Sequence, residues 1–199
     1  TSGESTKEDI PVLVQSGFLV VSVEYRRGPS YKFPAMIEDV KCAVRYLRSY
    51  PFLYNLDPDN IGALGNSSGG HLAALLGVTD GLAGWDVGEY LDKSSRVQAV
   101  VDYFGPADLT APDFLLDPDN QIPWAFGTDD HLDPIFALAS PVNYVSSDDP
   151  PFLILHGDKD SLVPLAQSDM LKEKLLANGV PAQLIVVQNA GHGFEQAAN

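Results

Sequence analysis

The segment Gly65-Asn66-Ser67-Ser68-Gly69 has the pattern G-x-S-x-G and lies between two apolar runs. Residues 61–64 before it predict a strand, and residues 72–76 after it predict a helix. A tight turn between a strand and a helix strains the backbone of the central residue and points the Ser67 hydroxyl outward. Only residues without bulk are expected to fit two positions before and two positions after Ser67, and Gly65 and Gly69 meet that need. The helix would also direct the free amide of Ser68 towards a developing oxyanion.

A glycine-serine cluster alone indicates only a turn, because these residues are common in loops. The interpretation gains weight from an acid and a histidine that follow in the order Ser, Asp, His. A serine hydroxyl needs a base to accept its proton, and histidine suits that task near neutral pH. His192 is the candidate base because two glycines flank it after a predicted strand. Asp160, which follows another predicted strand, would orient its imidazole.

Other ionisable residues offer alternatives to this assignment. Asp158 is a rival to Asp160, since it lies two positions nearer the preceding strand. His71, His131 and His156 are interpreted as structural histidines. Asp102 also ends a predicted strand, where it is expected to be a structural hydrogen-bond acceptor or part of a pocket wall.

Alternating strand and helix patterns predict a single α/β domain over residues 1–199. The repeated strand-helix-strand order implies a mostly parallel sheet with helices on both faces. Ser67, Asp160 and His192 all follow strand ends, so one edge of the sheet would collect them. The predicted strands cover 18–25, 61–64, 97–104, 151–157 and 182–187, and the predicted helices cover 5–15, 36–47, 72–76 and 164–177.

The stretch from about 109 to 144 breaks this alternation. It is rich in proline and aromatic residues, and a long irregular stretch in a compact domain is typical of a binding loop or lid. We therefore expect a cap-like segment here that contributes to a substrate pocket. Trp124, Phe126 and Phe136 are the candidate pocket residues, with packing in the core as the alternative for each.

Composition excludes several functions. The chain has 27 acidic and 12 basic residues, and its formal net charge of -15 disfavours a nucleic-acid or anionic-membrane partner. No apolar run approaches the roughly 20 residues of a membrane span. Cys42 is the only cysteine, and the histidines lack metal-ligand spacing, so no metal is expected. No glycine-rich loop matches a phosphate or dinucleotide cradle, so chemistry without a cofactor is predicted.

Several motifs in order resemble the α/β-hydrolase superfamily, and within it the esterase/lipase group. That group includes hormone-sensitive-lipase-like esterases and bacterial feruloyl and acetylxylan esterases. The resemblance implies a serine esterase that works through an acyl-enzyme, with Ser67 as nucleophile, Asp160 as acid, His192 as base and the Ser68 amide as an oxyanion donor. The matching segments are Val21-Ser22-Val23-Glu24-Tyr25-Arg26, Phe33-Pro34-Ala35, Gly65-Asn66-Ser67-Ser68-Gly69-Gly70-His71, Asp102-Tyr103-Phe104-Gly105-Pro106, His156-Gly157-Asp158-Lys159-Asp160 and Gly191-His192-Gly193-Phe194.

The sequence departs from the family pattern at both ends. No H-G-G-G-type oxyanion loop precedes the first motif, and the final helix usual in the family does not follow Phe194. The resemblance therefore implies an α/β-hydrolase domain truncated at both ends. The expected substrate is a small-molecule or carbohydrate-linked ester, such as an acetyl or feruloyl ester of plant polysaccharide. The alternatives are a serine peptidase of the prolyl-oligopeptidase type and a non-catalytic domain of the same fold.

Overall fold

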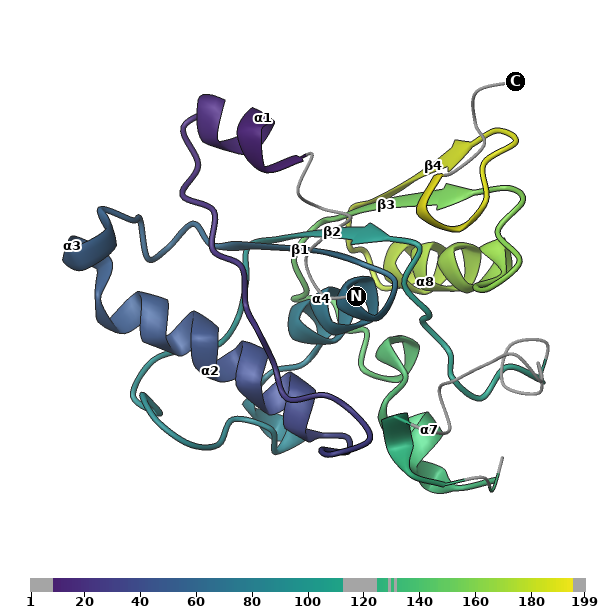
Figure 1. The fold of residues 1–199 in the computed structure, drawn as a ribbon, viewed down its shortest axis with the longest axis horizontal. Coiled ribbons are helices and arrows are strands. Elements are labelled where there is room, and N and C mark those ends of the chain that lie inside the picture. The colour runs from purple at the N-terminus through teal and green to yellow at the C-terminus, as the bar shows by residue number, and fades with distance from the viewer. Residues whose placement is uncertain (1–8, 113–124, 129, 131, 195–199) are drawn as a thin grey trace.

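The computed structural model describes residues 9–112, 125–128, 130 and 132–194. Helices and strands alternate along most of this chain (Figure 1). The strands are β1 (Gly62–Asn66), β2 (Ala99–Tyr103), β3 (Phe152–Gly157) and β4 (Ala182–Val187). The helices are α1 (Asp9–Gln15), α2 (Ala35–Ser49), α3 (Pro51–Tyr54), α4 (Ser68–Val78), α7 (Pro134–Leu138) and α8 (Leu165–Ala177), with short 3-10 turns at Gly81–Ala83, Pro141–Asn143 and His192–Phe194.

The four strands form one parallel sheet in the order β1-β2-β3-β4. In its register, Gly65 of β1 pairs with Asp102 of β2, which pairs with Ile154 of β3. Because the strands are parallel, each connection must carry the chain back to the edge of the sheet where the previous strand began. All four carboxyl ends therefore lie at the same edge, where the residues that follow them can meet. The predicted α/β fold with a parallel sheet is confirmed.

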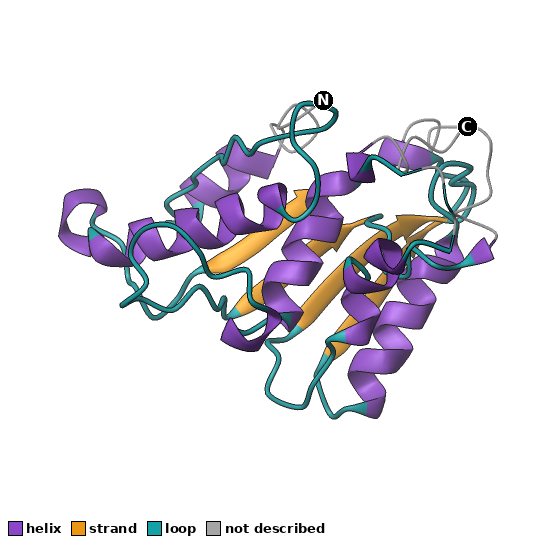
Figure 2. Ribbon diagram, turned by 90° about the horizontal axis from the view of Figure 1, so that it is seen from below, coloured by secondary structure: helices purple, strands orange, loops and turns teal. Residues whose placement is uncertain are grey.

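Helices are distributed unequally between the two sides of this sheet. α2, α4 and α8 lie on one side of the sheet, whereas α1 lies on the other (Figures 1 and 2). Burial along the strands alternates accordingly, since Val100 and Ile154 are at most 1% exposed while Val101 and Leu153 are half-buried. The main core therefore lies between the sheet and α4, a helix whose apolar side chains are buried nearly all round.

The predicted helices over 36–47 and 164–177 are present as α2 and α8. Ile37 and Val44 of α2 belong to the buried core, which explains the spacing of three and four in the sequence. Leu171 and Leu175 of α8 are fully buried, and Gly179, at φ +80°, follows the end of this helix. Among the described residues, no helix is long and apolar enough to cross a membrane.

The predicted strand over 18–25 is not formed. Within residues 9–112 no strand is assigned before β1, and Phe18, Leu19 and Val21 are 62%, 51% and 45% exposed. A strand needs a neighbour that takes up its backbone hydrogen bonds. Among the described strands β1 is the outermost on its side of the sheet, and the segment does not pair with it. The apolar pattern is thus present without the partner that would make it a strand.

The end of this segment is nevertheless fixed. The backbone amide of Arg26 donates to Asp39 of α2 at 2.8 Å, and its guanidinium binds the same carboxylate. Glu38, also on α2, lies 3.2 Å from the guanidinium. Tyr25, the residue before this anchor, places its hydroxyl 3.4 Å from the Ser68 hydroxyl. The segment therefore reaches the start of α4, although its earlier residues stay exposed.

Candidate active site

Ser67 lies in the turn that joins β1 to α4. Its φ of 53° and ψ of -120° fall in a region that residues with a side chain rarely adopt, so the strain predicted for this position is present. The amide of Ser67 donates to the carbonyl of Tyr103 in β2 at 2.8 Å, which ties the turn to the next strand. The turn is therefore held in place at the carboxyl edge of the sheet.

Close packing around this turn depends on particular glycines. A Cβ at Gly65 would collide with the backbone of Gly69, as the sequence pattern predicts. A Cβ at Gly69 would meet nothing within 4 Å, so the expectation that only a residue without bulk fits there is wrong. The other tight positions are Gly70 and Gly105, where a Cβ would run into the Asp102 carboxylate. These glycines let α4 approach β2 and the turn that follows it.

The structure brings Ser67, His192 and Asp160 together in a row. Nε2 of His192 lies 3.0 Å from Oγ of Ser67, and Nδ1 lies 2.7 Å from Oδ2 of Asp160. An ionised carboxylate can only accept, so Nδ1 carries the proton and Nε2 can accept from the serine hydroxyl. An imidazole in this position is able to withdraw the serine proton as the hydroxyl attacks an electrophile.

Four N–H groups surround the Asp160 carboxylate. Oδ1 accepts from the amides of Leu162 and Val163, each at 2.9 Å. Oδ2 faces Nδ1 of His192 at 2.7 Å and Nε2 of His156 at 3.3 Å. Burial acts to raise the pKa of the Asp160 carboxyl, but the hydrogen bonds, above all those from the two imidazoles, outweigh burial and hold that pKa well below its usual range. The carboxylate therefore stays ionised at neutral pH.

Asp158, the rival acid, has a different partner. Its Oδ1 accepts from the amide of Asn189 at 2.6 Å, so its carboxylate links the turn after β3 to the turn after β4. Asp160, two residues further on, is the acid that contacts His192. The geometry thus favours Asp160 for the orienting role, in line with the family pattern.

Phe104 is a site residue that the sequence reasoning missed. Its ring is 4.6 Å from the His192 imidazole between centroids, in an edge-to-face arrangement, and the residue is 2% exposed. A φ of +44° strains its backbone, directly after β2. The signal was available in the motif Tyr103-Phe104-Gly105-Pro106, where a bulky residue between a strand end and a Gly-Pro pair indicates a turn with a packing role.

Ser68 is the first residue of α4, so its amide is one of the helix donors that lack an acceptor within the helix. The positive end of the helix dipole lies at the same place. Together they make the start of α4 suitable for an oxyanion formed next to Ser67. The assignment of the Ser68 amide as that donor stays a prediction.

The remaining described histidines are buried and hydrogen-bonded. His71 donates to the carbonyl of Ala139 at 2.7 Å, and burial lowers its pKa to about 4, so it is neutral. His156 contacts the Ser168 hydroxyl and the Val163 carbonyl, as expected of a structural histidine, but it also reaches Asp160. His131 lies outside the described residues. In the described part of the chain, no group of three His, Cys, Asp or Glu residues could hold a metal ion.

Asp102 is buried behind the serine turn. Its Oδ1 accepts from the amide of Gly105 at 2.9 Å, which confirms the structural acceptor interpretation. Its Oδ2 has no hydrogen-bond partner among the described residues. The residue is 1% exposed, and burial raises the pKa of its carboxyl to about 6. This carboxyl is therefore much easier to protonate than that of Asp160.

The aromatic pocket candidates lie in or near the core. Phe136 is 1% exposed, and its ring is 5.5 Å from that of Phe126 between centroids. Phe126 in turn packs against Phe33, a residue of the buried core. Trp124 lies outside the described residues. Core packing is thus observed for the two described rings, while a substrate contact by any of the three stays a prediction.

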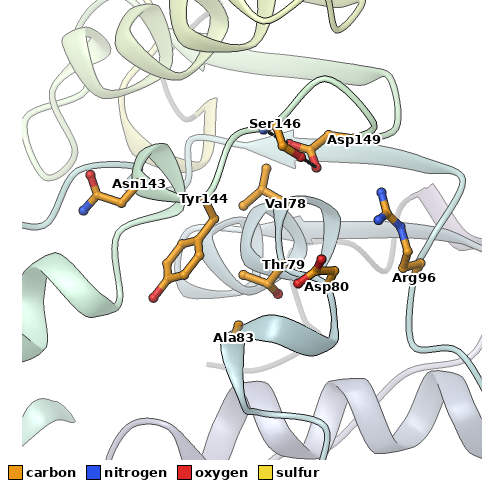
Figure 3. Close-up of a pocket in the computed structure, with 9 residues that line it drawn as sticks. All are labelled: Val78, Thr79, Asp80, Ala83, Arg96, Asn143, Tyr144, Ser146 and Asp149. Atoms are coloured by element: carbon orange, nitrogen blue, oxygen red, sulfur yellow. Dashed lines mark hydrogen bonds between the residues drawn. The ribbon is translucent and has the colours of Figure 1, made fainter.

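A cavity of about 330 Å³ is lined in part by Val78, the last residue of α4 (Figure 3). α4 begins directly after Ser67, and it ends at the cavity, an axial distance of roughly 15 Å for a helix of this length. The Ser67 hydroxyl therefore does not face this cavity. The residues that line the cavity are Val78, Thr79, Asp80, Ala83, Arg96, Asn143, Tyr144, Ser146 and Asp149.

The parallel sheet and the strained serine turn define an α/β-hydrolase domain. A family model described as BD-FAE matches residues 2–175, and the chain belongs to this family. The resemblance inferred from the sequence motifs is confirmed.

Curated relatives agree with this membership. The chain is 34% identical over 196 residues to Esterase LipQ of Mycobacterium tuberculosis, and 33% identical over 191 residues to the probable carboxylic ester hydrolase LipM of the same organism. These matches cover 94% and 89% of the chain but 45% and 43% of the relatives. The chain thus spans about half the length of these curated relatives.

Solved structures extend the likeness to three dimensions. A truncated form of a carbohydrate esterase from gut microbiota is 38% identical, with a TM-score of 0.84 over 94% of this chain and 71% of that one. An acetyl ester-xyloside bifunctional hydrolase from Caldicellulosiruptor lactoaceticus is 29% identical, with a TM-score of 0.77 over 94% of this chain and 68% of that one. Both support the fold observed here.

Proposed function

We propose that this chain is a serine hydrolase that cleaves carboxylic esters through an acyl-enzyme on Ser67. The observation that carries the proposal is the hydrogen-bonded row from Ser67 through His192 to Asp160, at 3.0 and 2.7 Å. A serine in this row sits on a strained turn at the sheet edge where α/β proteins bind ligands. The esterase names of the relatives point to the same reaction class.

In the acylation step, Oγ of Ser67 forms a bond to the ester carbonyl carbon while its proton passes to Nε2 of His192. The Asp160 carboxylate stabilises the imidazolium, and the Ser68 amide donates to the oxyanion. Collapse breaks the bond to the alcohol oxygen, and the alcohol leaves with the proton from His192. Water then attacks the acyl-enzyme with the same proton transfers, which releases the carboxylic acid and restores the serine.

The substrate class that we propose is an acetyl or feruloyl ester carried by a plant polysaccharide. Two of the similar structures are described as a carbohydrate esterase and an acetyl ester-xyloside hydrolase. An ester on a neutral sugar is also compatible with a protein of net charge -15, which would repel an anionic polymer.

A fluorophosphonate probe tests for an activated serine. We expect the wild-type chain to be labelled, and Ser67→Ala to lose the label entirely. Ser94→Ala, which removes an exposed serine, provides the matched control and should label like the wild type. Equal labelling of wild type and Ser67→Ala would refute an activated Ser67 and favour a non-catalytic domain.

Turnover assays then define the reaction class. We expect hydrolysis of an aryl acetate and release of acetate from acetylated xylan oligosaccharides, with no cleavage of a prolyl amide. Faster turnover of a feruloyl ester than of the acetyl ester would move the substrate assignment to feruloyl groups. Cleavage of the prolyl amide without ester cleavage would contradict the esterase proposal and support the peptidase alternative.

A further inference from the structure

Two imidazoles share one oxygen of the Asp160 carboxylate. Nδ1 of His192 lies 2.7 Å from Oδ2, and Nε2 of His156 lies 3.3 Å from the same oxygen. His156 is in β3 and is fully buried, so it meets neither solvent nor a substrate at the surface. His156 therefore reaches the site through Asp160.

The hydrogen-bond partners of His156 fix where its proton is. Nε2 faces the carbonyl of Val163 at 2.8 Å and the Asp160 carboxylate at 3.3 Å, and both groups can only accept. Nε2 must therefore carry a proton. Nδ1 lies 2.6 Å from the Ser168 hydroxyl, which can donate to it. His156 is thus a fixed donor aimed between the Val163 carbonyl and the acid.

The same imidazole also controls the other carboxylate oxygen. Val163 accepts from His156 through its carbonyl and donates to Oδ1 of Asp160 through its amide at 2.9 Å. His156 therefore holds the turn whose amides orient Oδ1, while its own N–H lies beside Oδ2. Ser168 belongs to α8 and is fully buried, so the ring is braced against a packed helix.

Phe104 and Asp102 complete the surroundings of this pair of imidazoles. The Phe104 ring is 4.6 Å from His192 and 6.4 Å from His156 between centroids, edge-to-face in both cases. The Asp102 carboxyl is the other acid that interacts electrostatically with His156. Asp102 lies in β2 and Phe104 comes directly after it. The arrangement of Asp160 and His192 therefore depends on β2, β3 and α8 together.

We propose that His156 is a positioning residue that fixes the Asp160 carboxylate towards His192. The proposal rests on the proposed function, because it assumes that Asp160 orients the base. The N–H of His156 partly neutralises the negative charge on Oδ2 of Asp160, and this charge would otherwise stabilise the His192 imidazolium. Loss of this donor should loosen the carboxylate and also leave more negative charge for His192.

The test compares His156→Leu with His156→Gln over a range of pH. In His156→Leu we expect kcat for an aryl acetate to fall by on the order of 10- to 100-fold with KM nearly unchanged, because the base is misoriented. The acid limb of the kcat profile should move to higher pH, because His192 is protonated more readily beside the less shared carboxylate. His156→Gln keeps an N–H at a similar reach and should restore most of kcat and the original limb.

His71→Leu is the matched control, because it removes another buried imidazole that donates to a backbone carbonyl without contacting Asp160. It should lower the Tm to a similar degree and leave the acid limb in place. A His156→Leu variant with lowered Tm but unchanged kcat and unchanged limb would overturn the proposal. So would an acid limb that moves equally in His71→Leu.

NMR titration of the His192 ring protons separates this proposal from the proposed function, because it needs no turnover. Displacement of the His192 titration curve to higher pH in His156→Leu, but not in His156→Gln, supports the positioning role even if the chain proves inactive towards esters. An unchanged curve in both variants refutes it. Absence of labelling at Ser67 in the wild type would instead count against the proposed function alone.

Discussion

Residues 18–25 and 97–104 look alike in the sequence but differ in the structure. Both are β-branched, aromatic and almost continuously apolar, and both predict a buried strand. The second contains β2, which pairs on both sides with β1 and β3. The first is mostly exposed and pairs with no described strand. The difference shows that an apolar run forms a strand only where a neighbouring strand takes up its backbone hydrogen bonds.

The two regions also differ in what they contribute to the site. β2 carries Asp102 and leads into Phe104, and its Tyr103 carbonyl holds the amide of Ser67. The earlier segment reaches the site only at its end, through the contact of Tyr25 with Ser68. The edge of the sheet that holds Ser67 therefore depends on the paired strands far more than on residues 18–25.

Hydrogen exchange gives the largest expected contrast between these regions. The amide of Val100 donates to Pro151 within the sheet, whereas residues 19–25 have no backbone acceptor among the described residues. We expect β2 amides to exchange only on global unfolding, on the order of 10⁴-fold more slowly than those of residues 19–25. Exchange monitored by mass spectrometry or NMR measures the ratio. Comparable protection of both regions would show that residues 18–25 are paired in solution.

A matched pair of valine substitutions gives the next largest effect. Val100→Ala removes a side chain that is 1% exposed, and the lost burial plus the cavity should cost about 2–3 kcal/mol of unfolding free energy. Val21→Ala removes a side chain of a residue that is 45% exposed and should cost less than about 0.5 kcal/mol. Urea denaturation of both variants checks the difference. Equal costs would mean that Val21 is buried in the native state.

Local patterns in the sequence predict part of the fold. Spacing in α2 and α8 depends on contacts between residues three and four apart, so a local pattern suffices to locate these helices. The four paired strands follow from short apolar runs bounded by turn residues. Whether a run such as 18–25 pairs depends on residues distant in sequence, which a local pattern does not contain.

For the site, motif order predicts which residues meet but not how they are held. Ser67, Asp160 and His192 follow strand ends, and parallel topology then places them at one edge. The approach of His156 to Asp160 and of Phe104 to His192 arises from the conformation of two turns. A need for glycine at Gly70, rather than at Gly69, comes from the closeness of α4 to Asp102. None of these contacts has a spacing rule in the sequence.

Glycine substitutions test the packing between β1 and α4 directly. In Gly65→Ala the new methyl group would meet the backbone of Gly69, so we expect a loss of about 1–3 kcal/mol and greatly reduced labelling of Ser67. Gly69→Ala introduces a methyl group into open space on a helix and should stabilise the fold by about 0.5 kcal/mol. Thermal melting compares the two. A neutral Gly65→Ala would contradict the tight turn.

The smallest expected effect concerns the charge that β2 buries at Asp102. The pKa of its carboxyl is raised to about 6 in the folded chain, above the ordinary value of 3.8. Between these values the native state binds more protons than the unfolded state, so stability falls as pH rises. This contribution is fully present below about pH 4 and is lost as pH passes through about 6. From pH 5 to pH 7 the loss is about 1 kcal/mol.

Asp102→Asn removes this titration while its side-chain oxygen can still accept from the Gly105 amide. We expect the variant to lose about 1 kcal/mol less stability than the wild type between pH 5 and pH 7, measured by urea denaturation at each pH. Glu24→Gln removes one negative charge from the exposed segment 18–25 and should leave the wild-type pH dependence unchanged. Of these two carboxyl groups, only that of Asp102 lies inside the paired sheet. An equal change in the pH dependence of stability in both variants would therefore show that burial of the Asp102 carboxyl does not cause the loss of stability between pH 5 and pH 7.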